Sequence, residues 1–128
     1  MALTLKIKDK EYSFRFGFAF LRAINPLHRQ MVEELNEFEE IGFQLEVVKW
    51  LGSNDYEGLV NILWYANKTE SPRLERKDIE EHIEGLSEEE LEELETTVKD
   101  FLSGTALLSK RMKAAVQAAE RATEATEQ

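Results

Sequence analysis

The sequence predicts an α+β fold that is mainly α. An N-terminal two-stranded antiparallel β-hairpin is expected to pack on a bundle of about five or six helices, with an alanine-rich helix at the C-terminus. Two patterns predict this: apolar and polar residues alternate over the first sixteen residues, and helical spacing of apolar residues follows. The length of 128 residues suits one domain whose core needs no disulfides, and the chain has no cysteine.

The hairpin is predicted from period-2 alternation in residues 3–8 and 11–16, which is typical of half-buried strands. A two-residue loop at 9–10 would pair Leu5 with Phe14 and place every apolar side chain on one face. Two strands alone are marginally stable in water, so this face should rest on helices. The outer edges would stay unpaired unless a partner or a second copy covers them.

Helices are expected from Gly17 onward. A short one should follow Gly17 and end before Asn25-Pro26, since a residue that precedes proline disfavours the α region. A weak amphipathic segment comes next, and then a second helix that is expected to end at Gly52. The apolar positions of these two segments are Leu27, Met31, Val32 and Leu35, and then Phe43, Val47, Val48 and Leu51.

The next helix, residues 56–66, carries apolar residues on nearly every side, which predicts a central position. Asn54 or Asp55 should cap its start. Trp64 and Tyr65 on this helix are expected in the core, with a role as partner-binding anchors as the alternative.

The C-terminal third carries two apolar stripes. A loop at 68–72 precedes a helix that should close at Gly85, and Ser87 with Glu90 forms a capping box before the next helix. The stripes have coiled-coil-like spacing and consist of Leu91, Leu94, Val98 and Phe101, and then Leu108, Met112, Ala115, Ala119 and Ala122. We divide the chain into a hairpin and helical body, 1–104, and an alanine-rich helix with a loose tail, 105–128, which either shares the domain or projects from it.

Charge falls in blocks on a chain with a net charge of −10. Residues 78–100 hold eleven acids and one base, and residues 33–60 hold eight acids and one base. Such a balance disfavours nucleic-acid binding. The acids form either solvated helix faces or a surface for a basic partner. No apolar run is long enough to span a membrane, and the N-terminus has no secretory signal, so no membrane association is expected.

Catalytic and cofactor-binding patterns are missing. The two histidines, His28 and His82, lie far apart in the sequence, and His82 among surface acids is more typical of a solvated face than of a metal site. The glycines form no phosphate-binding loop, and no serine lies in a nucleophile elbow. We expect no enzyme, no cofactor and no metal.

The opening residues LTLKIKDKEYSFRFGFAFLRAIN resemble the N-terminus of tail assembly chaperones from siphophages of Gram-positive bacteria. Those proteins begin with a hairpin of the form I-K-x-K-x-Y-x-F-x-F-G-x-x-F, which occupies Ile7 to Phe20 here. The resemblance continues at Gly42-Phe43, in LGSND, in the helix at 56–66 and in P-R-L-x-x-x-D-I-E-x-x-I from residue 72, and it covers roughly residues 3–103. The family often has glycine at the hairpin turn, where this chain has Asp9, and segments 26–41 and 105–128 match nothing diagnostic.

The resemblance implies a non-catalytic protein that acts in the host cytoplasm and is absent from the finished virion. Such proteins bind the long, helix-rich tape measure protein, keep it soluble and recruit tail tube subunits around it. A longer frameshifted form is often made from the same gene.

Two surfaces are candidates for partner binding. One is the hairpin edge, which could add a strand or pair two copies. The other is the stripe of Leu91, Leu94, Val98 and Phe101 with its alanine-rich continuation, which could dock helix against helix with a partner, and the C-terminal helix could also pair two copies. Its alternative is a purely intramolecular helical hairpin about Gly104. The residues of this predicted binding stripe are Leu91, Leu94, Val98, Phe101, Leu108 and Met112.

Two other functions stay open at this point. An acidic protein could mimic DNA and block a basic host protein, which the acid-rich block 78–100 motivates. The chain could also be a structural component of the tail, which its presence in purified virions would reveal.

Overall fold

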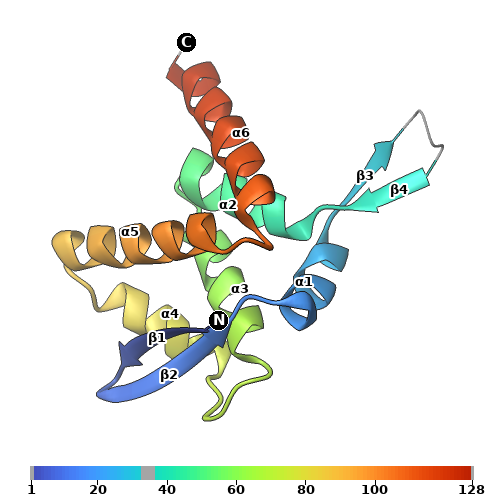
Figure 1. The fold of residues 1–128 in the computed structure, drawn as a ribbon. Coiled ribbons are helices and arrows are strands. Elements are labelled where there is room, and N and C mark those ends of the chain that lie inside the picture. The colour runs from blue at the N-terminus through green and yellow to red at the C-terminus, as the bar shows by residue number, and fades with distance from the viewer. Residues whose placement is uncertain (1, 33–36, 128) are drawn as a thin grey trace.

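The computed structural model describes residues 2–32 and 37–127. These residues form two β-hairpins, six α-helices and one 3-10 turn (Figure 1). The predicted α+β, mainly α class is confirmed. The elements are β1 (Ala2–Ile7), β2 (Lys10–Arg15), α1 (Phe18–Ile24), η1 (Asn25–Leu27), β3 (Arg29–Val32), β4 (Glu37–Glu40), α2 (Gly42–Ser53), α3 (Tyr56–Asn67), α4 (Arg76–Glu84), α5 (Glu88–Gly104) and α6 (Ser109–Glu127).

The N-terminal hairpin forms, but its predicted register was wrong by two residues. Leu5 pairs with Tyr12, not Phe14, and Lys8-Asp9 is the turn. Both turn residues have positive φ, as the favoured two-residue hairpin turn requires. Lys8 at this turn reaches carboxylates on α4 at Asp78 and Glu81, which accounts for its place there. A shift of two residues keeps every side chain on its predicted face.

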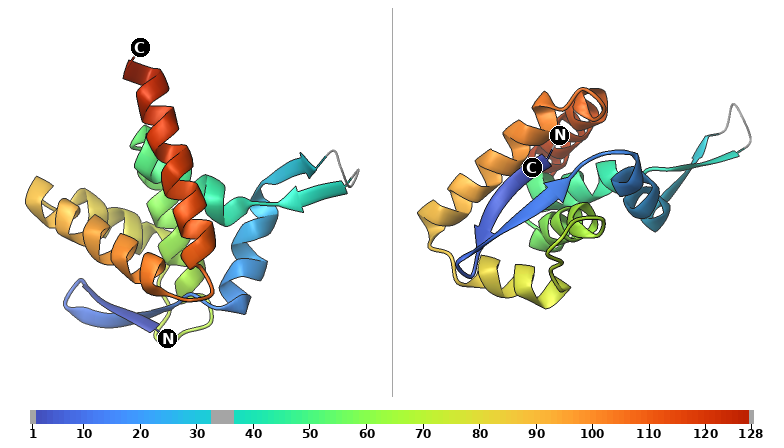
Figure 2. Two further views of the ribbon diagram at one scale, coloured as in Figure 1. Left: turned by 45° about the horizontal axis from the view of Figure 1, so that its top comes forward. Right: turned by 60° about the horizontal axis from the view of Figure 1, so that its bottom comes forward.

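A second hairpin, β3–β4, replaces the weak helix expected around Leu27, Met31, Val32 and Leu35. Arg29 pairs with Glu40, and the backbone N–H of Ile41 donates to the carbonyl of His28 to close the base of the ribbon. Proline at position 26 ends α1 in the η1 turn, and the glutamates that follow would repel one another along a helix. Leu35 lies outside the described residues. The ribbon projects from the helical body (Figures 1 and 2).

The helices surround α2 and α3, which lie at the centre. The first hairpin and α4 cover α3, and α6 packs lengthwise on α2 (Figure 2). Trp50 is fully buried, and its indole N–H donates to Glu95 on α5 at 2.9 Å. Trp64 and Tyr65, expected in the core, are only half-buried, and Lys68 lies over both rings.

Two helix starts follow the capping rules that the sequence indicates, and one expected helix end does not. Asp55 caps α3 and the Ser87–Glu90 capping box starts α5, as predicted. The expected end of α2 at Gly52 was wrong: the helix continues to Ser53 and ends at Asn54, which takes the left-handed conformation. Gly52 is needed inside the helix instead, because a Cβ there would lie 3.1 Å from Cα of Ala119 on α6.

A buried carboxylate ties the second hairpin to the helices. Glu46 on α2 is 1% exposed, and its oxygens lie 2.9 Å from Nε2 of His28, 2.9 Å from Nδ2 of Asn61 and 3.3 Å from Nζ of Lys49. Arg76 on α4 donates in turn to Asn61. A buried carboxylate is tolerable only with such partners, so this network holds the base of the ribbon against α2, α3 and α4.

Candidate protein-binding site

The predicted binding stripe lies on the inner side of α5 and at the start of α6. Leu94, Val98, Leu108 and Met112 are buried, and Leu91 and Phe101 are half-buried. The ring of Phe101 lies 5.7 Å from that of Phe16 in the first hairpin. The structure thus brings Leu94, Val98, Phe101, Leu108 and Met112 into or against the chain's own core. Their contact with a partner protein stays a prediction.

Helices α5 and α6 diverge where they meet, and so they do not form the helical hairpin considered for this segment. The chain leaves α5 at Gly104, turns through a hydrogen bond from Leu108 N–H to the Thr105 carbonyl, and enters α6 in a new direction (Figure 1). The stripe along α6, including Met112 and Ala119, faces α2 instead. This divergence opens a concave angle between α5, α6 and α2.

A groove occupies this angle. It consists of two adjoining cavities of about 460 and 360 Å³ that share Lys99 and Val116. Its lining exposes more apolar than polar surface. We call it the α6 groove; its residues are Leu51, Lys99, Ser103, Ser109, Lys110, Lys113, Val116, Gln117, Ala119, Glu120 and Thr123.

The rim of the α6 groove is positively charged on a chain that is strongly acidic. Lys99, Lys110 and Lys113 are exposed and face only one carboxylate of the groove, that of Glu120. Among the ion pairs between described residues, none includes these lysines. Their ammonium groups are therefore available to a negatively charged partner.

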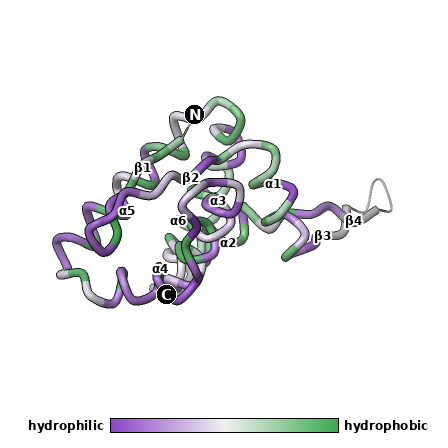
Figure 3. The backbone as a smooth tube through the Cα atoms, turned by 90° about the horizontal axis from the view of Figure 1, so that it is seen from below, coloured by the Kyte–Doolittle hydropathy of each residue, from purple (hydrophilic) through white to green (hydrophobic). Residues whose placement is uncertain are grey.

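The first half of α5 carries the opposite charge. Exposed glutamates cover it from Glu88 to Glu93, and Figure 3 shows this helix as largely hydrophilic. The backbone N–H of Ser87 donates to the Glu90 carboxylate, and this bond, together with the Ser87 side chain, lowers the pKa of Glu90 and favours its ionised form at the helix N-terminus. The α5–α6 unit thus has an acidic end and a lysine-rimmed end.

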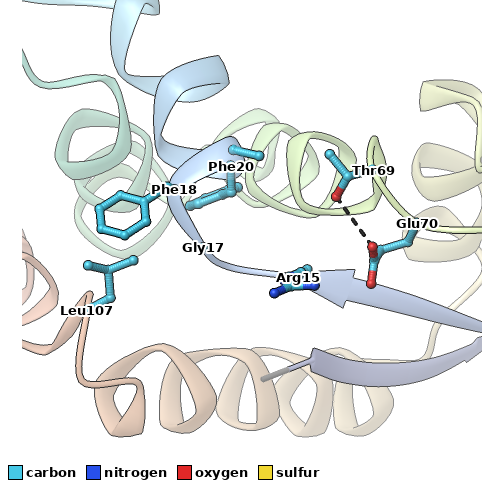
Figure 4. Close-up of a pocket in the computed structure, with 8 residues that line it drawn as sticks. Arg15, Gly17, Phe18, Phe20, Thr69, Glu70 and Leu107 are labelled. Carbon is cyan, nitrogen blue, oxygen red and sulfur yellow. Dashed lines mark hydrogen bonds between the residues drawn. The ribbon is translucent and has the colours of Figure 1, made fainter.

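A second exposed surface surrounds the start of α1. Phe18 and Leu107 lie next to each other although they are far apart in the sequence (Figure 4). Phe18 is 64% exposed and Leu107 is 40% exposed. Both line two cavities of about 390 and 420 Å³. This Phe18–Leu107 patch is apolar surface that the chain itself leaves uncovered.

The sequence analysis missed both surfaces. The groove lysines lie in two parts of the sequence, Lys99 at the end of the acidic block 78–100 and Lys110 and Lys113 after Gly104. The signal that could have found them is the run Lys110, Arg111 and Lys113 next to alanines, on a helix whose acids come later. Phe18 was predicted on a helix, but without an assigned environment.

Within residues 2–32 and 37–127, no group of three or more potential metal-ligating side chains comes together. His82 is half-buried, and burial lowers its pKa while nearby Glu90 opposes that shift. Among the helices of the same residues, none combines the length and apolarity that a membrane crossing requires.

The comparisons with known proteins agree with a protein-binding role. A family model described as phage tail assembly chaperone protein, TAC, matches residues 4–117. No curated protein and no solved structure matches the chain. The matched stretch includes both hairpins, α1 to α5 and the first half of α6. The chain therefore belongs to the phage tail assembly chaperone family.

Proposed function

We propose that this chain binds the tape measure protein during tail assembly, keeps it soluble and recruits tail tube subunits to it, without catalysis. Family membership supports a role in tail assembly and implies a non-catalytic one. The single observation that carries the proposed mechanism is the α6 groove, an open apolar channel with a lysine rim. Its occupant would be an amphipathic helix of the tape measure protein.

The dimensions of the groove suit a helix. From Lys110 to Thr123 the groove follows α6 for roughly 20 Å, the length of about thirteen helical residues. Exposed Ala114 and half-buried Ala118 add small side chains near the groove, which let a second backbone approach closely. Burial of apolar helix faces in such grooves is a recurring mode of peptide recognition.

The charge of the groove selects among helices. Lys99, Lys110 and Lys113 would pair with carboxylates that flank the apolar stripe of the bound helix. The lysine rim would repel basic helices from the groove. The overall charge of −10 would attract such helices only non-specifically, to other parts of the surface. None of the residues of the predicted binding stripe lines the groove. A partner would reach Leu108 or Met112 directly only if α6 separated from α2, which is a second route within the same proposal.

Co-expression with the tape measure protein of the same phage tests the proposal. The tape measure protein should stay soluble with the wild-type chain and precipitate without it. Lys99→Glu, Lys110→Glu and Lys113→Glu combined should abolish protection. Gln117→Trp, at an exposed position on the groove, should do so by filling it.

The matched control reverses three exposed lysines outside the groove, Lys6, Lys10 and Lys77. This triple variant has the same net charge as the groove variant and should protect as well as the wild type. Equal insolubility of the tape measure protein with and without the wild-type chain would refute the proposal. Equal loss with both triple variants would refute the groove as the site.

Further parts of the proposal concern other partners and location. Recruitment of the tail tube protein predicts that it co-purifies with the chaperone–tape measure complex. Self-association through the unpaired edge of the first hairpin or through α6 is compatible with this role. The chain would act in the host cytoplasm and be absent from purified virions by mass spectrometry. Its detection there in stoichiometric amounts would indicate a structural tail component instead.

A further inference from the structure

The Phe18–Leu107 patch is apolar surface that local geometry forces outward. Phe16 and Phe20 point into the core, with their rings 5.1 Å apart, and Phe18 between them begins α1 on the outer side. Leu107 precedes the fully buried Leu108 in the turn between α5 and α6. Segments far apart in the sequence thus bring Phe18 and Leu107 side by side (Figure 4), and both residues line two neighbouring cavities.

The rim of this patch carries both signs of charge. Arg15 and Glu70 line the cavity on one side of Phe18. Arg22, Arg111 and Glu40 line the cavity on the other side. Three arginines and two glutamates make this patch slightly positive on a chain of net charge −10. Two acidic molecules repel each other over most of their surfaces, so a patch like this one is where they can approach.

We propose that the Phe18–Leu107 patch binds the same patch of a second copy about a two-fold axis. A contact about a two-fold axis needs a self-complementary surface, because the same patch of both copies meets in it. The patch has an apolar knob beside hollows of about 390 and 420 Å³, and it has arginines beside glutamates. Each Phe18 enters a hollow of the other copy next to Leu107, and the arginines of one copy face the glutamates of the other.

This surface differs from the hairpin edge and from the α6 groove, so the dimer leaves both of them accessible. A partner helix that carries only one sign of charge would face some rim side chains of that same sign, and these would repel it. A second copy brings the matching carboxylates and guanidinium groups itself. The inference therefore concerns assembly of the chaperone and does not depend on which tail protein it binds.

Sedimentation velocity of the full chain, from about 1 to about 200 μM, tests the proposal. The wild type should shift from monomer to dimer with concentration. Phe18→Asp should weaken dimerisation at least about tenfold, the loss expected for a buried aromatic anchor. The matched control is Leu27→Asp, which alters another exposed apolar residue outside both cavities and should dimerise as the wild type does. Circular dichroism should show both variants folded, since both side chains are exposed.

A charge exchange tests the arrangement without depending on which arginine meets which glutamate. The variant Arg15→Glu/Arg22→Glu has an acidic patch, and the variant Glu40→Arg/Glu70→Arg has a basic one. Each alone should be monomeric, and an equimolar mixture should form a heterodimer.

Three outcomes would overturn the proposal. These are a wild type that is monomeric throughout, a dimer that Phe18→Asp leaves intact, and a mixture of the charge variants that stays monomeric. A monomeric wild type whose Phe18→Asp variant loses capture of a tail protein would assign the patch to that partner instead.

Discussion

Gly58 lies where α3 packs closely on the backbone of α2, and Gly58→Ala tests this contact. A Cβ at Gly58 would lie 2.3 Å from the carbonyl oxygen of Glu46 and 3.1 Å from the backbone nitrogen of Trp50. Both neighbours are backbone atoms of α2, and both residues are buried, so neither can give way as a flexible side chain would. The extra methyl group must therefore push α3 away from α2.

The expected cost follows from two opposing effects. Overpacking of a filled interior costs about 1–3 kcal/mol, and backbone-to-backbone contact points to the upper end of that range. Replacement of a helical glycine by alanine gains at most about 1 kcal/mol. We expect Gly58→Ala to lower the free energy of unfolding by about 2 kcal/mol, a substantial part of the roughly 5–15 kcal/mol that a domain has.

Gly104→Ala is the matched control. It ends α5, and a Cβ there meets no atom within 4 Å. This substitution should be neutral or stabilise by up to about 1 kcal/mol. Urea unfolding followed by far-UV circular dichroism measures both variants, and with a slope of roughly 1–3 kcal/mol per molar the Gly58 variant should lose about 1 M in its midpoint. A Gly58→Ala midpoint equal to that of Gly104→Ala would refute the close approach of α2 and α3.

Three further predictions rest on single contacts. Ser87→Ala should lower the free energy of unfolding by about 1 kcal/mol, because it removes the cap of α5. Ser103 lies on the same helix and makes no side-chain hydrogen bond among those described, so Ser103→Ala should change that free energy by less than about 0.5 kcal/mol in the same urea assay. Burial lowers the pKa of His82 below the ordinary histidine value of 6.5, so the unfolded chain takes up this proton first as pH falls. The free energy of unfolding should therefore decrease as pH falls through the ordinary histidine range, and it should decrease less in His82→Gln; the same pH dependence in both proteins would contradict this. Trp50 is fully buried and Trp64 only half-buried, so Trp64→Phe should make the remaining fluorescence much harder to quench with acrylamide than that of the wild type.

The features that could be predicted from the sequence are those that local rules decide. Alternation in residues 3–16 specifies which side chains of the hairpin face inward. The observed register differs from the predicted one by two residues, and such a shift leaves each side chain on the same face. The capping box at Ser87 and the cap at Asp55 depend on side chains within three residues. Their outcome needed no knowledge of the rest of the fold.

Tertiary packing decides the features that were missed. Gly52 satisfies the local rule for a helix end, yet it lies inside α2 because α6 passes too close for a side chain. The second hairpin has no clear alternation, and its base is held by Glu46, a residue of a later helix. The stripe from Leu91 to Met112 was predicted from its spacing, either to bind a partner or to close a helical hairpin, because the period of apolar residues does not say which helix they face.

The same reasoning explains why the candidate site was harder to predict than the fold. Lys99 lies on α5, Lys110 and Lys113 lie on α6, and only the divergence of the two helices makes them one rim. On the proposed function, this composition suits a chaperone that must release its client. A floor of Val116 and Ala119 buries little area per helical turn, so affinity depends on the lysine rim and should weaken steeply with salt. A deep pocket lined by large apolar residues would hold the client permanently, whereas a shallow charged groove can hold a helix and yield it to the growing tube.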